Sequence, residues 1–151
     1  MEKLQKEGLT RSIGVSNFRK SHLQNLLSKV HIVPSINQIE TNPQMVDEET
    51  IQYCKENKIG VEAWSPLGSG ACLNNPKIQE IANKYQKSSA QIILRWLLQK
   101  GIVILPKSVH ENRIKENIDL FNFVLENEDV ELINQLNQHK RTGPDPDNFD
   151  F

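Results

Sequence analysis

Short apolar runs rich in β-branched residues alternate with segments of helical spacing, and this alternation constrains the fold more than any other feature. Four such runs occur, at residues 12–16 (SIGVS), 35–40 (SINQIE), 60–64 (GVEAW) and 101–105 (GIVIL). β-Branched residues favour strands because they pack well on a pleated surface. We therefore predict four β-strands within the 151 residues.

Helical spacing follows each of these runs. Apolar side chains recur at i, i+3, i+4 and i+7 in three segments, which predict helices over Leu23 to Val30, Ile78 to Tyr85 and Ala90 to Leu97. Three more helices are predicted: one capped by Asp47 through Ile51 and Cys54, one on Ile114, Ile118 and Phe121, and one opened by Asp129 over Val130, Ile133 and Leu136. Strands that alternate with helices build right-handed βαβ units, so the sequence predicts an α/β fold with a parallel sheet.

Polar or aromatic residues stand where the predicted strands end. Parallel sheets bind ligands beyond the carboxyl ends of their strands. The residues at these ends are Ser16 and Asn17, Gln38 and Glu40, Trp64, Ser65 and Leu67, and Lys107 and Ser108. Amides that both donate and accept hydrogen bonds, together with a flat indole, suit an aromatic carboxamide such as nicotinamide. The alternative is that these residues only mark where each strand leaves the core.

The segment ILPKSVHENRIKEN at residues 104–117 indicates an anion site. Lys107 and Ser108 are expected at a helix N-terminus, where unpaired backbone N–H groups favour phosphate. Arg113 and Asn117 are one i+4 step apart and project from one helix face. The alternative is a capped helix whose cations are merely solvated.

Composition excludes several other classes of function. Eighteen basic against nineteen acidic side chains give no general attraction to nucleic acid or to an anionic membrane. No apolar run approaches a membrane span, and MEKLQKEGLT lacks the apolar core of a signal peptide, so a cytoplasmic protein is expected. Cys54 and Cys72 lack CxxC spacing, which favours reduced thiols over a disulfide or a metal site.

Five motifs in order resemble the second half of an aldo-keto reductase: GLTRSIGVSNF (8–18), PSINQIETNP (34–43), EAWSPLGSG (62–70), KSSAQIILRWLLQKG (87–101) and ILPKSVHENRIKEN. The ending RTGPDPDNFDF (141–151) resembles bacterial members that act on diketogluconate, glyoxal and similar small carbonyls. The resemblance implies that residues 1–151 form a partial domain, the cofactor-binding C-terminal half of a TIM (β/α)₈ barrel. Strands five to eight would be present and the first four β/α units absent.

This family transfers a hydride from NADPH to an aldehyde or ketone, and the resemblance assigns roles within the chain. Trp64 would stack on the nicotinamide, where many members have tyrosine, and Arg113 would favour NADP over NAD. The other implied contacts are Ser16, Asn17 and Gln38 to the carboxamide; Ser65, Leu67 and Ser69 to the pyrophosphate; Lys107 and Ser108 to the 2′-phosphate; and Glu116 and Asn117 near the adenosine.

The resemblance supplies no proton donor. The family uses a tyrosine tuned by lysine, aspartate and histidine from the first four units, whereas Tyr53 and Tyr85 stand in predicted helices. We therefore expect the chain alone to be inactive, with Met1 an internal start of a longer enzyme that acts on small carbonyls. Self-pairing through exposed barrel edges or closure as a doubly wound sheet are the alternatives. In function, the alternative is a non-catalytic nucleotide-binding or self-associating module.

Overall fold

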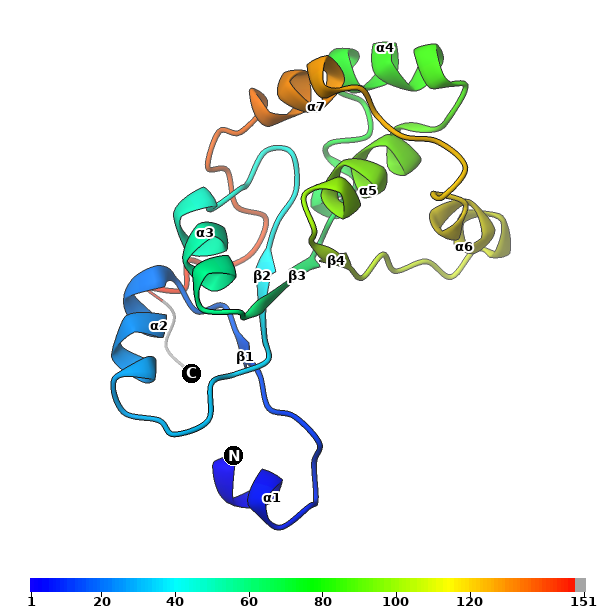
Figure 1. Cartoon of the computed structure of the whole chain (residues 1–151). Coiled ribbons are helices and arrows are strands. Elements are labelled where there is room, and N and C mark those ends of the chain that lie inside the picture. The colour runs from blue at the N-terminus through cyan, green and yellow to red at the C-terminus, as the bar shows by residue number, and fades with distance from the viewer. Residues whose placement is uncertain (149–151) are drawn as a thin grey trace.

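A four-stranded parallel sheet forms the centre of the protein (Figure 1). The computed structural model describes residues 1–148, so the last three residues of RTGPDPDNFDF lie outside the described residues. The strands are β1 (Val15–Ser16), β2 (Ile36–Glu40), β3 (Gly60–Trp64) and β4 (Val103–Ile104), and they lie side by side in that order. The predicted α/β fold with a parallel sheet is confirmed. The doubly wound alternative is wrong, because the strand order never reverses.

The two central strands are longer than the two edge strands. β2 and β3 pair over five residues, from Ile36 opposite Gly60 to Glu40 opposite Trp64. β1 and β4 have two residues each, shorter than the predicted runs 12–16 and 101–105. β1 and β4 each have only one neighbouring strand, and each is paired with it over two residues, which gives their observed length.

Seven α-helices and one 3₁₀ turn surround the sheet in residues 1–148. They are α1 (Glu2–Lys6), α2 (Lys20–Leu27), α3 (Glu48–Glu56), η1 (Gly68–Gly70), α4 (Pro76–Tyr85), α5 (Ser89–Gln99), α6 (Glu111–Ile118) and α7 (Asn127–Asn134). All six predicted helices are present, but Val30, Phe121 and Leu136 lie beyond the ends of α2, α6 and α7. Val30 and Leu136 are half-buried there. The spacing of apolar residues therefore indicated correctly that these positions are partly buried, but it did not indicate where the helices end.

Two predicted helix starts have different outcomes. Asp47 caps α3 as predicted, and its carboxylate accepts a hydrogen bond from the Thr50 backbone N–H at 3.0 Å. The prediction that Asp129 opens α7 is wrong, since Asp129 lies in the first turn. Its side chain instead accepts hydrogen bonds from Lys84 Nζ at 2.8 Å and Tyr85 Oη at 2.6 Å.

The core lies between one face of the sheet and the helices that cover it. α3 packs against β3 and α5 against β4. Ile39, Val61 and Ala63 point into this core, and Trp96 on α5 is fully buried. No helix within residues 1–148 is long and apolar enough to cross a membrane.

Candidate cofactor site at the carboxyl edge of the sheet

The twelve predicted site residues lie at the carboxyl edge of the sheet, mostly in two adjoining hollows. A cleft of about 730 Å³ is lined by eight of them: Ser65, Leu67, Ser69, Lys107, Ser108, Arg113, Glu116 and Asn117. A smaller pocket of about 480 Å³ is lined by three: Ser16, Asn17 and Trp64. Gln38 lines neither hollow. Because Trp64 and Ser65 are chain neighbours, the hollows meet at the end of β3.

The turn after β1 positions Asn17. Asn17 has a φ of 58°, in the left-handed region that asparagine tolerates better than most residues. The buried Asn37 side chain holds the next residue, because its amide donates to the Phe18 carbonyl at 2.8 Å and accepts from the Phe18 N–H at 3.3 Å. The Asn17 carboxamide oxygen then accepts a hydrogen bond from Trp64 Nε1 at 2.7 Å. The amide and the indole are therefore fixed relative to each other.

Gln38 lies on the same face of the sheet as Glu62 and Trp64, away from the core. Its Nε2 donates to Glu62 Oε1 at 2.5 Å, across the pair of central strands. The Ser16 hydroxyl donates to the Gln38 backbone carbonyl at 3.2 Å. Within residues 1–148, Gln38 Oε1 and Asn17 Nδ2 have no hydrogen-bond partner, which leaves one acceptor and one donor for a ligand.

A tight turn after β3 forms one wall of the larger cleft. Ser65 and Ser69 have φ values of 50° and 54°, and Ser65 Oγ accepts a hydrogen bond from the Ser69 N–H at 3.1 Å. Between them Gly68 has a φ of 58°, and a Cβ there would lie 2.9 Å from Cys72 Sγ. Glycine is therefore required for the turn to pack against Cys72.

Cations form the other wall of the cleft. α6 begins at Glu111 with His110 as its N-cap, so the expectation that Lys107 and Ser108 stand at the helix N-terminus is wrong. They lie in the preceding loop, where Ser108 Oγ accepts a hydrogen bond from the His110 N–H at 3.1 Å and so orders the approach to α6. Arg113 is on α6, and within residues 1–148 neither it nor Lys107 has an ion-pair or hydrogen-bond partner.

Sequence reasoning missed three residues of the cleft at the start of α5. Ser88, Ser89 and Ala90 line it, and Ser88 caps α5 by accepting a hydrogen bond from the Gln91 N–H at 3.2 Å. The Gln91 side chain in turn accepts from the Ser88 N–H at 3.1 Å. The capping-box pattern Ser-x-x-Gln was the available signal, since it marks a helix N-terminus that could face an anion.

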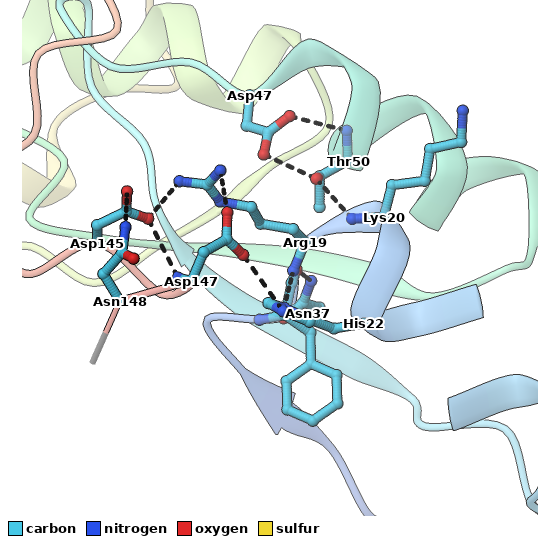
Figure 2. A network of polar contacts seen from close by, with 10 residues as sticks. Arg19, Lys20, His22, Asn37, Asp47, Thr50, Asp145, Asp147 and Asn148 are labelled. Atoms are coloured by element: carbon cyan, nitrogen blue, oxygen red, sulfur yellow. Dashed lines mark hydrogen bonds and ion pairs between the residues drawn. The ribbon is translucent and has the colours of Figure 1, made fainter. Parts of the chain in front are cut away.

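The C-terminal tail also reaches the site. Pro144 and Pro146 line the smaller pocket beside Trp64. Figure 2 shows Asp145 and Asp147 against Arg19 at the start of α2, with a 2.5 Å contact from Arg19 Nη2 to Asp145 Oδ1. The backbone N–H of Asp147 and the Arg19 guanidinium hold the pKa of Asp145 below its ordinary value.

The start of α2 is itself held by α3. The Thr50 hydroxyl accepts a hydrogen bond from the Lys20 backbone N–H at 3.0 Å and donates to Asp47 at 2.8 Å, as Figure 2 shows. Within α2, His22 Nδ1 accepts from the Arg19 N–H at 3.2 Å. These hydrogen bonds hold the backbone at the start of α2, from which the Arg19 side chain reaches the tail.

Other chemistry has little support in the described part of the chain. Residues 1–148 contain no group of three or more His, Cys, Asp or Glu side chains that could hold a metal ion. Cys54 and Cys72 are free and buried, and burial raises the pKa of both thiols, which disfavours the reactive thiolate. Tyr85 Oη is engaged with Asp129 and with the Glu126 N–H.

Comparison with known proteins identifies one family. Residues 1–138 match the aldo/keto reductase family. The chain is 49% identical to a glyoxal reductase of Bacillus subtilis over 151 residues, which is 100% of this chain and 55% of the relative. It is 45% identical to the methylglyoxal reductase DkgA of Escherichia coli K12, over 99% of this chain and 55% of the relative.

Solved structures agree with the sequence match. An aldo-keto reductase of Bombyx mori in complex with NADP aligns with a TM-score of 0.90 and 41% identity, over 97% of this chain and 51% of the other. The chain thus spans about half the length of the relatives that it matches.

Proposed function

The chain belongs to the aldo/keto reductase family, and from this premise we propose that it is the cofactor-binding half of an NADPH-dependent carbonyl reductase. Residues 1–151 would form the C-terminal half of the barrel, strands five to eight. The order of the motifs, together with the share of the relatives that the chain spans, supports this assignment. The substrate of the whole enzyme would be a small aldehyde or ketone such as glyoxal or methylglyoxal, after the names of two relatives.

One observation carries the cofactor proposal: two partnerless cations line a cleft that meets an aromatic pocket. Lys107 and Arg113 have no partner in residues 1–148, and both line the 730 Å³ cleft. Both cations are exposed and line the same cleft, so their charges are available to a phosphate. We assign Lys107, Ser108 and Arg113 to the 2′-phosphate, Ser65, Leu67 and Ser69 to the pyrophosphate, and Glu116 and Asn117 to the adenosine.

The aromatic pocket fits the nicotinamide. A carboxamide offers one acceptor oxygen and a donor nitrogen, which complements the free Asn17 Nδ2 and the free Gln38 Oε1. Ser16 and Trp64 line the same pocket, and Trp64 offers its ring for stacking. The bound cofactor would supply a hydride, and these residues would orient its ring.

Among residues 1–148, neither tyrosine is placed to donate the proton that carbonyl reduction requires. Tyr53 lies within α3, and Tyr85 Oη donates to Asp129 while it accepts from the Glu126 N–H. Neither hydroxyl lies among the residues that line the two hollows. We therefore propose that the isolated chain binds NADPH but does not reduce carbonyls.

A titration of purified chain with NADPH and with NADH, followed by cofactor fluorescence, tests the site. Arg113→Ala should weaken NADPH binding about tenfold to a hundredfold and leave NADH binding unchanged, because only NADPH has the 2′-phosphate. Lys115→Ala is the matched control, since Lys115 is also on α6 but is paired with Glu111 at 2.7 Å and does not line the cleft. Equal losses for both nucleotides, or none, would refute the assignment.

A second candidate, a self-associating module, rests on apolar side chains at the β4 edge. Ile118 and Phe121 are 72% and 75% exposed, and they line an apolar groove of about 330 Å³ with Ile104 and Pro106. Soluble monomers rarely leave such side chains clustered at the surface. The molar mass in solution decides: twice the chain mass at micromolar concentration supports self-association, and a monomer excludes it.

A further inference from the structure

We propose that Glu40 is a positioning residue, which fixes the Trp64 indole by anchoring the C-terminal tail against it. The inference deepens the proposed function and rests on it, because a fixed indole is useful only if a cofactor ring stacks there. It concerns residues more than 100 positions apart in the chain, which meet at the end of β2.

The Glu40 carboxylate is buried and is satisfied by the tail. Its side chain has no exposed surface, and a buried charge is costly unless it is hydrogen-bonded. Oε1 accepts from the Thr142 backbone N–H at 2.7 Å and from its hydroxyl at 2.5 Å, and Oε2 accepts from the Gly143 N–H at 3.3 Å. Arg141 Nη1 lies 3.9 Å from Oε2. These contacts hold residues 141–143 in a defined position at the end of β2.

In this position of the tail, Gly143 lies against Trp64. A Cβ on Gly143 would lie 2.4 Å from Trp64 Cη2 and 3.3 Å from both Cζ2 and Cζ3, so the Gly143 backbone abuts the outer edge of the six-membered ring. The opposite edge of the indole is tied by Nε1 to Asn17 at 2.7 Å. With both edges held, rotation of the ring is blocked while Trp64 still lines its pocket.

Glu40 accepts three hydrogen bonds from the tail beside Trp64. The ion pairs of Asp145 and Asp147 with Arg19 involve side chains that are 32–41% exposed, so salt and water weaken them. The Ser65 and Thr142 hydroxyls are 3.5 Å apart, at the limit of a hydrogen bond. Loss of Glu40 should therefore release residues 141–143 even with the Arg19 contacts in place.

Indole N–H signals of the 151-residue chain, measured by nitrogen-15 NMR, separate positioning from general stability. The chain has two tryptophans, and Trp96 is fully buried on α5 with its Nε1 donating to Asn134 at 2.9 Å. Trp64→Phe identifies which signal belongs to Trp64. In Glu40→Ala the Trp64 signal should move while the Trp96 signal stays, and NADPH should bind about tenfold more weakly.

Two further variants keep the inference open to refutation if Glu40→Ala does not fold. Glu40→Gln retains one oxygen for Thr142 and should restore most of the Trp64 signal and of the affinity. Thr142→Val removes only the hydroxyl and should move the Trp64 signal in the same direction by a smaller amount. Graded changes confined to Trp64 in these variants support positioning.

Several results would overturn the inference. An unmoved Trp64 signal in the folded variants, or equal movement of both tryptophan signals, would show that Glu40 does not act on Trp64. A moved Trp64 signal with unchanged NADPH affinity would refute the positioning role. If wild-type chain fails to bind NADPH, the proposed function falls and the positioning role with it, while the Trp64 signal still reports on the tail anchor.

Discussion

The side chains around Trp64 are held by hydrogen bonds from three strands and the tail, whereas Lys107 and Arg113 have no partner in residues 1–148. Asn17 accepts a hydrogen bond from the indole, and Gly143, whose N–H donates to Glu40, abuts the six-membered ring. α6, which carries Arg113, has no buried residue and packs against α5 at one end of the molecule (Figure 1). The aromatic side of the site is thus rigid and the cationic side is open.

This difference matches what each side would recognise. A stacked ring is recognised by the orientation of a plane, so a preorganised indole avoids ordering costs on binding. A phosphate is recognised by charge, which acts over several ångströms and tolerates mobile, solvated side chains. Substitutions on the aromatic side should therefore change stability as well as binding, and substitutions on the cationic side should change binding alone.

The largest effect is expected at Asn37, beneath the aromatic side. Asn37→Ala leaves the N–H and carbonyl of Phe18 without partners and should lower the free energy of unfolding by about 3 kcal/mol. Asn112→Ala, an exposed amide on α6, should change it by less than about 0.5 kcal/mol. Urea unfolding monitored by circular dichroism measures both, and similar losses would erase the distinction between the two sides.

A smaller effect is expected when a methyl group is added to Gly143, where its backbone contacts Trp64. Gly143→Ala should lower the free energy of unfolding by about 1–2 kcal/mol and shift tryptophan emission, because the methyl group would overlap Trp64 Cη2. Gly60→Ala at the start of β3 is the control, since its methyl would meet the Ser35 carbonyl oxygen at 3.3 Å and not the indole. Unchanged emission in Gly143→Ala would mean that the tail does not restrain the ring.

The smallest effect concerns pH and the ion pair between Asp145 of the tail and Arg19. The pKa of Asp145 is lowered in the folded chain, so its contribution is present above the unfolded value of about 3.9 and is lost as pH falls through the folded value. Tryptophan emission should stay constant from neutral pH to about 5 and change below about 4. Asp147 and His22 also lie beside Arg19 and the tail, so the emission curve of Asp145→Asn is subtracted from that of the wild-type chain to isolate Asp145. Identical curves for the two proteins would contradict the role of Asp145.

Local sequence patterns predicted much of the fold and the site. β1 and β3 end where their apolar runs end, so Asn17, Trp64 and Ser65 were recognised as strand-end residues. The N-cap Asp47 was readable because capping depends on residues three apart. The i+4 spacing of Arg113 and Asn117 likewise brought both into one cleft.

Long-range contacts were beyond sequence reasoning. Glu40 was only a strand-end residue in the sequence, because its partners at 141–143 are about 100 positions away and carry no spacing signal. The same holds for Asp129, which resembled a helix cap but is bound by Lys84 and Tyr85. In both cases, hydrogen bonds to residues distant in the chain determine the role of the side chain, and its local sequence position does not.

The most direct test of the central claim measures binding and turnover on the same purified chain. NADPH fluorescence gives the binding isotherm, and absorbance at 340 nm follows NADPH oxidation with methylglyoxal. We predict saturable binding that exceeds NADH binding, with no oxidation above the rate without protein, because in our proposal the described residues would orient the cofactor and neither tyrosine would reach its site. Robust turnover, or no binding of NADPH at millimolar concentration, would contradict the account.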